Sequence, residues 1–152
     1  MTPAKIRATV VAERISWIRK MIQSVQTLPM DSYDEFVNDH RNVASAESYL
    51  RRGIEALLDL GRHILAKGFA VAVTEYKEIG DSLSKKGILS HEHGIIFRQI
   101  AGYRNRMVHF YHEISNEELY HLSTQNLKDI EDLLEALVRW LKDHPDKMDH
   151  QI

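Results

Sequence analysis

The sequence of 152 residues contains no cysteine and no run of 18 uncharged apolar residues. Without cysteine the chain forms no disulfide, no thiolate metal site and no cysteine nucleophile, which fits a reducing compartment. The lack of a long apolar run excludes a membrane span. Charged residues at Lys5, Arg7, Glu13 and Arg14 also interrupt any signal-peptide core. We therefore expect a cytoplasmic protein without membrane attachment.

An excess of either charge is also missing, because 20 Lys and Arg stand against 22 Asp and Glu, for a net charge of −2. Such a chain has no overall attraction to nucleic acid, so any binding of this kind must rest on a local group of cations. No repeat and no long linker divides the chain. We expect one domain over residues 1–152, with a polar, frayed tail at about 145–152.

Proline and glycine are scarce, with three and seven residues, and this favours helices. Apolar residues recur at helical spacing over about residues 3–28, 32–67, 75–86, 90–112 and 115–144. Residues 69–74 alternate like a strand, but a lone strand has no partner, so a loop or a helix extension is expected there. The predicted fold is all-α, an up-and-down bundle of about five helices.

The fourth expected helix lacks acidic residues over most of its length. From Gly94 to His112 it carries Arg98, Arg104 and Arg106 without one Asp or Glu. At the overall proportion of acids in the chain, these 19 residues would hold two or three. The segment is therefore a local positive patch on a slightly negative protein.

Helical spacing sorts this segment into three stripes of residues. The expected core stripe is Ile96, Ile100, Tyr103, Met107 and Phe110. A stripe almost opposite to it comprises Arg98, Gly102, Asn105, His109 and His112. An intermediate stripe comprises Phe97, Ala101, Arg104, Val108 and Tyr111. We therefore expect the polar line to face away from the bundle interior.

Three side chains of this helix are the candidates for chemistry. Asn105 lies one turn before His109 and is close enough to orient its ring. Arg104 and His109 differ by about 140° around a straight helix. They would meet only through the long arginine side chain, a helix distortion or a second copy of the helix. A twofold dimer supplies that copy and places two sets of these residues in one cleft.

These residue types suit RNA cleavage without a metal ion. Histidine takes a proton from a ribose 2′-hydroxyl or gives one to the leaving 5′-oxygen. Arginine holds phosphate oxygens and neutralises charge that develops on phosphorus. The chain has no dense carboxylate cluster of the kind that a two-metal nuclease needs. His91 and His93 lack a clear third ligand, so neither a metal nor another cofactor is expected.

The stretch from Arg104 to Tyr111 reads Arg-Asn-Arg-Met-Val-His-Phe-Tyr. It resembles the Arg-x4-His-x-Tyr motif of HEPN-domain toxins of the HepT type. The flanking residues 112–120 and the earlier residues 55–64 are also similar to that family, and the resemblance covers roughly residues 5–143. It implies an all-helical homodimer with its cleft at the subunit interface. It also implies a metal-independent endoribonuclease that leaves 2′,3′-cyclic phosphate and 5′-hydroxyl ends.

The resemblance further implies roles for single residues and a partner. Arg104 and His109 would be catalytic, and Asn105 would support them. Tyr111 would accept AMP from an MntA-like nucleotidyltransferase antitoxin, as in a type VII-like toxin–antitoxin system. The charges of Arg98 and Arg106 are expected to contact RNA phosphate or lie at an interface.

Two other readings remain open from the residues alone. The chain could be a non-catalytic helical subunit that presents nucleotide or substrate to a nucleotidyltransferase, with Arg104 and Arg106 binding phosphate. It could also be a scaffold that only oligomerises. His63, four residues after Asp59, is expected to form a structural hydrogen bond with that carboxylate.

Overall fold

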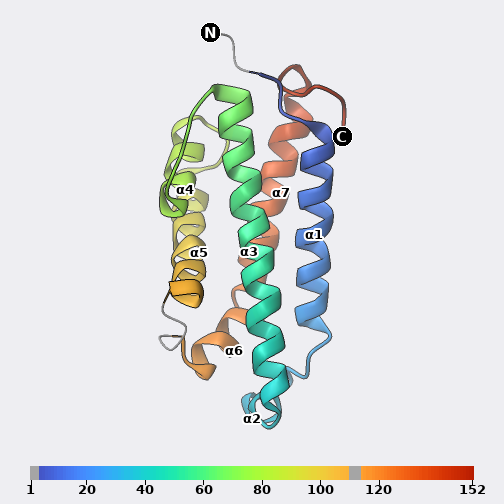
Figure 1. Cartoon of the computed structure of the whole chain (residues 1–152), viewed down its shortest axis with the longest axis vertical. Helices are drawn as coiled ribbons and strands as arrows, with labels where there is room; N and C mark the ends of the chain where they lie inside the picture. The colour runs from blue at the N-terminus through green and yellow to red at the C-terminus, as the bar shows by residue number, and fades with distance from the viewer. Residues whose placement is uncertain (1–3, 110–113) are drawn as a thin grey trace.

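The computed structural model describes residues 4–109 and 114–152. Within them the chain forms seven α-helices, and the prediction of an all-α fold is confirmed. The helices are α1 (Ala8–Gln26), α2 (Tyr33–Val37), α3 (His40–Phe69), α4 (Tyr76–Lys85), α5 (His91–His109), α6 (Asn116–Thr124) and α7 (Leu127–Asp143), followed by the 3-10 turn η1 (Pro145–Lys147). Figure 1 shows α1, α3 and α7 running side by side, with the α4–α5 hairpin packed along α3. None of these helices, in the described residues, is long and apolar enough to cross a bilayer.

The central helix α3 spans 30 residues and contacts each of the other six helices in the described residues. Its buried face includes Leu50, Ile54, Leu57, Leu60 and Ile64. Two glycines on α3 are sites of close packing. A Cβ at Gly61 would lie 2.9 Å from Ile79 Cγ2, and one at Gly53 would lie 3.1 Å from Met21 Cβ. The helix ends at Ala70, which takes the left-handed conformation with φ of 55°.

Two of the expected helices are each divided in two, so the expectation of about five helices is corrected to seven in the described residues. The second breaks before α3, where the Asp39 carboxylate accepts a hydrogen bond from the Arg41 N–H at 2.9 Å. The fifth breaks at Asn126, whose amide donates to Asp129 at 2.9 Å. Asp39 thus acts as a helix cap, because its side chain binds one of the first unpaired N–H groups of α3. Asn126 makes no such capping bond to the backbone of α7. The predicted cap at Ser115 is present and accepts from Glu118 N–H at 3.1 Å.

The α4–α5 hairpin is held by two glycines that face each other. A Cβ at Gly80 would lie 2.5 Å from the Gly94 carbonyl oxygen, and one at Gly94 would lie 3.0 Å from the Gly80 oxygen. The backbones therefore approach closely because neither residue has a side chain. Ser90 caps α5 by accepting from His93 N–H at 3.0 Å. This hairpin brings the first turn of α4 beside the second half of α5.

The two ends of the chain lie together at one end of the bundle (Figure 1). The first helix begins at Ala8 rather than near Pro3, because residues 4–7 are extended and Ile6 pairs with Met148 in a parallel bridge. The Ile6 N–H donates to the Lys147 oxygen at 2.8 Å, and the Asp149 N–H donates to the Ile6 oxygen at 2.9 Å. Ile6 and Met148 are both buried. The expectation of a frayed tail is therefore wrong for these residues, because burial of the two apolar side chains fixes the backbone.

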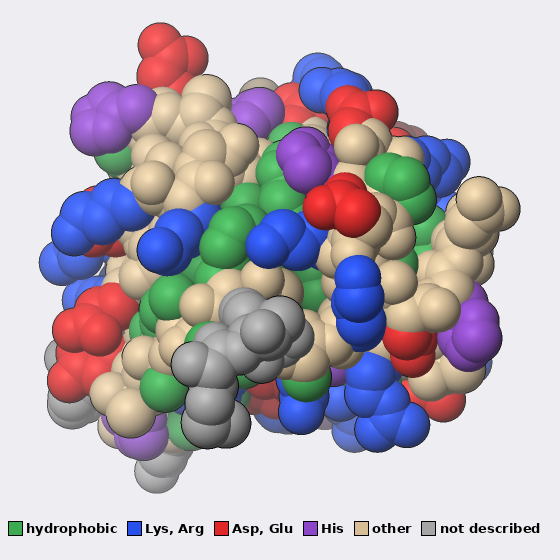
Figure 2. All heavy atoms as spheres, turned by 90° about the horizontal axis from the view of Figure 1, so that it is seen from above, with side chains coloured by type: hydrophobic (Ala, Val, Ile, Leu, Met, Phe, Trp, Pro, Cys, Tyr) green, Lys and Arg blue, Asp and Glu red, His purple; other side chains and the backbone are tan. Residues whose placement is uncertain are grey.

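Charges of both signs are interspersed on the surface at this end of the bundle. Figure 2 looks onto it and shows Lys and Arg side chains among Asp, Glu and His, with apolar atoms between them. This agrees with the near-zero net charge of the sequence. The visible face therefore offers no broad field of one sign to attract a polyanion.

Candidate functional site

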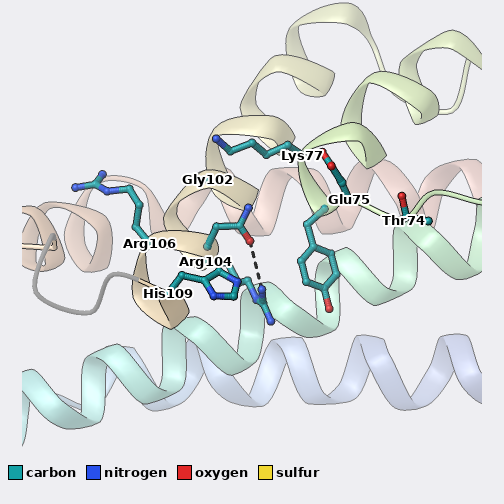
Figure 3. A pocket seen from close by; sticks show the side chains of 9 residues that line it. Thr74, Glu75, Lys77, Gly102, Arg104, Arg106 and His109 are labelled. Atoms are coloured by element: carbon teal, nitrogen blue, oxygen red, sulfur yellow. Dashed lines mark hydrogen bonds between the residues drawn. The ribbon is translucent and has the colours of Figure 1, made fainter.

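A hollow of about 520 Å³ lies between α5 and the start of α4. It is lined by Thr74, Glu75, Tyr76, Lys77, Gly102, Arg104, Asn105, Arg106 and His109. All three residues expected to carry the chemistry line it, together with Arg106, whereas Arg98 is exposed elsewhere on α5. Phe110, Tyr111 and His112 lie outside the described residues. The sequence-based grouping of Arg104, Asn105 and His109 is thus matched by one shared surface (Figure 3).

The α5 helix is rotated relative to the face expected from its pattern. Phe97, Ile100, Ala101 and Met107 are buried, whereas Ile96 and Tyr103 are only partly buried. The core face therefore falls between the expected core stripe and the intermediate stripe, because α5 packs against α3, α4 and α7 at once. Arg104 belongs to this side, and its side chain is only 16% exposed.

Arg104 is held by contacts to three neighbouring side chains. Its Nε donates to Glu55 Oε1 at 3.4 Å, and its Nη1 donates to Asn105 Oδ1 at 3.3 Å. The guanidinium carbon lies 4.5 Å from the centre of the Tyr76 ring. The expectation that Arg104 has no acidic partner within its own helix fits this arrangement, since Glu55 comes from α3. The surrounding low dielectric strengthens each of these contacts.

Glu55 is shared with a second arginine of its own helix. Arg51 Nη1 lies 3.7 Å from Glu55 Oε1, and Arg51 Nε lies 3.1 Å from Glu47 Oε1. A carboxylate that contacts two guanidinium groups is restricted in its orientation by both. Glu55 is therefore suited to fix the Nε edge of Arg104.

His109 is the last residue of α5, and its side chain is exposed. In Figure 3 its imidazole points toward the guanidinium of Arg104. Of the three expected ways for these residues to meet, the reach of the arginine side chain is the one seen within a single chain. Asn105 directs its oxygen to Arg104 rather than serving only as a neighbour of His109.

Arg106 and Arg98, expected to contact phosphate, differ in their surroundings. Arg106 forms a two-pronged ion pair with Glu118 of α6, at 2.7 and 2.8 Å. Figure 3 shows its side chain directed away from Arg104 and His109. A phosphate at Arg106 would have to compete with this carboxylate. Arg98 is exposed and does not line the hollow.

The family of the chain follows from a comparison with known proteins. The model of the family described as Ribonuclease HepT-like matches residues 13–137. This chain belongs to the HepT-like ribonuclease family. The resemblance seen in the sequence is confirmed, and the chain is an endoribonuclease of the HEPN type. No curated protein matches it.

Several solved structures share the fold of this HepT-like ribonuclease. A tri-AMPylated Shewanella oneidensis HEPN toxin in complex with MNT antitoxin is 21% identical, with a TM-score of 0.76 over 84% of this chain and 96% of that chain. A toxin–antitoxin crystal structure with AMP-PNP is 20% identical, with a TM-score of 0.76 over 84% of this chain and 97% of that chain. YutE, a cytosolic protein of unknown function from Bacillus subtilis, is 16% identical, with a TM-score of 0.74 over 88% of this chain and 90% of that chain. At these identities the likeness concerns the fold.

Sequence reasoning missed the far wall of the hollow in this HepT-like ribonuclease. Tyr76 and Lys77 come from α4, and Glu55, which binds Arg104, comes from α3. Helical periodicity relates residues of one helix, so it gives no information on partners from another. Glu55 was noticed only as part of a segment similar to the family. An aromatic residue at the start of the polar helix α4 was the available signal for Tyr76.

The expected hydrogen bond between His63 and Asp59 is replaced by another one. The His63 Nε2 accepts from the backbone N–H of Arg7 at 3.1 Å. Burial, with Lys67 and Arg7 nearby, lowers the pKa of His63, and burial raises the pKa of the Asp59 carboxyl. The neutral ring therefore links the segment before α1 to α3. His63 is not among the residues that line the hollow. No group of three His, Asp or Glu placed to hold a metal ion occurs in the described part of the chain.

Proposed function

We propose that this protein is the toxin of a type VII-like toxin–antitoxin system, a metal-independent endoribonuclease that acts as a homodimer. The observation that carries this proposal is the shared hollow of Arg104, Asn105 and His109 in a chain of the HepT-like ribonuclease family. The exposed imidazole, the guanidinium beside it and the open volume of about 520 Å³ supply a base, a charge stabiliser and room for a phosphodiester.

The proposed reaction is an internal transfer at phosphorus. An imidazole takes the proton of the ribose 2′-hydroxyl, and the 2′-oxygen forms a bond to phosphorus. The bond from phosphorus to the 5′-oxygen breaks, and the departing oxygen takes a proton from a second imidazole. The products are a 2′,3′-cyclic phosphate and a 5′-hydroxyl. Arg104 neutralises charge on the phosphorus oxygens, and Asn105 holds the Nη1 edge of Arg104.

A twofold dimer supplies the second imidazole for this reaction. His109 is exposed at the end of α5, and the neighbouring Val108 leaves 38% of its apolar side chain in contact with solvent. A twofold contact at this end of α5 would cover Val108 and bring two copies of His109 into one cleft. Refolding the unmodified protein together with an excess of His109→Ala is expected to reduce its activity below the share expected from simple dilution, because a mixed dimer keeps only one of the two imidazoles. Activity that falls only in proportion to dilution would contradict a shared cleft.

The central test is cleavage of single-stranded RNA by purified protein in EDTA, with analysis of the new ends. His109→Ala and Arg104→Ala are each expected to lower kcat by at least about 100-fold, the usual scale for loss of an acid–base or charge-stabilising group. His91→Ala, an exposed histidine at the other end of α5, and Arg52→Ala, an exposed arginine on α3, are the matched controls and keep full activity.

The end groups decide between this proposal and its alternatives. Cyclic phosphate ends that depend on His109 support the nuclease. Binding of RNA without cutting would favour a non-catalytic subunit of a nucleotidyltransferase, and full cleavage by both variants would overturn the catalytic roles.

The antitoxin of the proposed system is an MntA-like nucleotidyltransferase that transfers AMP to Tyr111. A negative phosphate added to a residue two positions after His109 would repel RNA and obstruct the hollow. Incubation with the partner and ATP is expected to raise the intact mass by one or more AMP groups and to abolish cleavage. The Tyr111→Phe variant should escape both effects. Full modification of Tyr111→Phe would exclude this residue as the acceptor.

A further inference from the structure

Tyr76 lies between two arginines that come from different helices. It is the first residue of α4, is partly buried and packs against the core. The Arg104 guanidinium carbon is 4.5 Å from its ring centre, and that of Arg62 is 4.6 Å away. Arg62 belongs to α3 and Arg104 to α5. Through these two contacts one aromatic ring connects three helices, because each cation is attracted to the electron-rich face of the ring.

The position of Tyr76 is itself fixed from two sides. Arg62 Nη2 donates to the backbone oxygen of Thr74 at 3.3 Å, so the same arginine binds the loop before α4 and the ring that follows. Further along α4, the absence of a Cβ at Gly80 lets the helix lie directly against Gly94 of α5. The ring therefore has little freedom to move relative to α5.

Arg104 makes hydrogen bonds and an aromatic contact at the same time. Glu55 holds the Nε edge, and Asn105 holds Nη1. Tyr76 contacts the guanidinium with its aromatic ring and not through a hydrogen bond. Within residues 4–109 and 114–152, the hydrogen bonds of Arg104 engage Nε and Nη1. The Nη2 edge is the part of the guanidinium that can donate to a phosphate oxygen.

We infer that Tyr76 is a positioning residue for Arg104, which its ring holds in the orientation that presents the Nη2 edge to the scissile phosphate. The two hydrogen bonds of Arg104 are long, at 3.4 and 3.3 Å, and hold the guanidinium only loosely, so contact with the ring further restricts its orientation. Such a group adds little to the binding of RNA. It matters when charge develops on phosphorus, since small misplacement of a charge stabiliser is costly at that point.

This inference rests on the proposed catalytic role of Arg104, and kinetics of single-site variants test it. Tyr76→Leu keeps an apolar side chain of substantial size but removes the aromatic face. We expect its kcat to fall about tenfold, within the range of a desolvated cation–aromatic contact, while KM changes by less than about threefold. Tyr76→Phe keeps the face and is expected to retain kcat within about threefold of the unmodified protein.

A matched control separates positioning from general loss of packing. Tyr49 on α3 is also partly buried against the core, and it does not line the hollow. Tyr49→Leu should lower the melting temperature as Tyr76→Leu does but leave kcat unchanged. Equal loss of kcat in Tyr49→Leu, or in Tyr76→Phe, would overturn the inference.

The failure of the inference and that of the proposed function are distinguishable. If Arg104→Ala is inactive while folded Tyr76→Leu is fully active, only the role of Tyr76 is wrong. If Arg104→Ala is fully active, the proposed function itself fails. A measurement on the unmodified protein covers the case in which Tyr76→Leu does not fold. Proton NMR should show nuclear Overhauser effects between the Tyr76 ring and the Arg104 δ-methylene, and their absence would overturn the inference.

Discussion

His63 shows how one partly buried side chain can make the fold sensitive to pH. Its Nε2 accepts a hydrogen bond from the Arg7 N–H, which only a neutral imidazole can do. Burial, with the positive charges of Lys67 and Arg7, lowers its pKa below the ordinary value of about 6.5. The unfolded chain therefore binds a proton at His63 at a higher pH than the folded chain does.

Because the unfolded state binds more protons in this range, the free energy of unfolding should decrease as pH falls below about 6.5 toward the lowered pKa of His63. Urea denaturation between about pH 7.5 and 5.5 measures this. The variant His63→Gln offers an amide oxygen as acceptor and does not titrate, so its profile should be flatter. Identical slopes for the two proteins would show that another group controls stability here.

At the residue scale, sequence reasoning located the side chains but not their partners. The exposure of His109 follows from helical spacing, which depends only on neighbours along the chain. The burial of Arg104 does not follow, since it depends on Glu55 and Tyr76, which are 49 and 28 positions earlier in the sequence. Such contacts are set by the packing of whole helices.

At the scale of elements, the close contact between α4 and α5 determines the position of Tyr76 and Lys77, which line the hollow. A Cβ at Gly80 would meet Gly94 O at 2.5 Å and Phe97 Cβ at 2.9 Å. These are backbone or buried atoms that cannot simply rotate away. Gly102 of α5 is in a different situation, because a Cβ there would meet only Lys77 Cε, at 3.7 Å.

Gly80→Ala is expected to force α4 away from α5 and lower the free energy of unfolding by about 1–3 kcal/mol, as overpacking does. It should also lower kcat, since it moves Tyr76 relative to Arg104. Gly102→Ala is expected to raise the free energy of unfolding by up to about 1 kcal/mol, because alanine favours the helix. Chemical denaturation and RNA cleavage assays measure both effects. A fully active and stable Gly80→Ala would mean that the two helices tolerate separation.

The same scale explains why the helix count was low. Apolar periodicity continues from residue 32 through α3 and from residue 115 through α7. It therefore predicts one helix in place of α2 and α3, and one in place of α6 and α7. The breaks occur at single residues, Asp39, which caps α3 with its carboxylate, and Asn126, whose side chain bonds to Asp129, and such local effects are weaker than the apolar pattern. The helix end near residue 86, by contrast, was predicted, and Gly87 directly after it has a φ of 74°, which favours glycine.

For the whole molecule, affinity for RNA depends on the positions of a few cationic side chains. The net charge is −2, and the hollow combines Arg104, Arg106 and Lys77 with one acid, Glu75. Affinity for RNA should therefore come from two or three phosphate contacts rather than from the overall field.

We expect the affinity for a single-stranded RNA blocked at its 2′-hydroxyl to depend modestly on salt. With two or three contacts per hollow, log Kd should rise with log salt with a slope of roughly 1.4 to 2.1. Fluorescence anisotropy over a range of KCl concentrations measures this slope. A slope several times larger would reveal a broad phosphate-binding surface outside the hollow.

The helical class and the family were accessible from the sequence because both rest on patterns within single helices. The pairing of the chain ends was not, since Ile6 and Met148 are 142 positions apart and the tail reads as polar. A bridge of this kind becomes visible only when the bundle brings both residues to the same end.

The ion pair between Glu55 and Arg104 means that the resting enzyme carries its own counter-ion. An entering anion must displace the Glu55 carboxylate, which lies 3.4 Å from the guanidinium Nε, or bind only to the Nη2 edge. Inorganic phosphate, with no adjoining nucleotide to add binding energy, should therefore inhibit weakly. Neutralising the competitor with Glu55→Gln should lower the inhibition constant of phosphate, and an unchanged constant would show that the carboxylate does not compete. The site would in this way bind small phosphates weakly and favour a phosphodiester that belongs to a polymer.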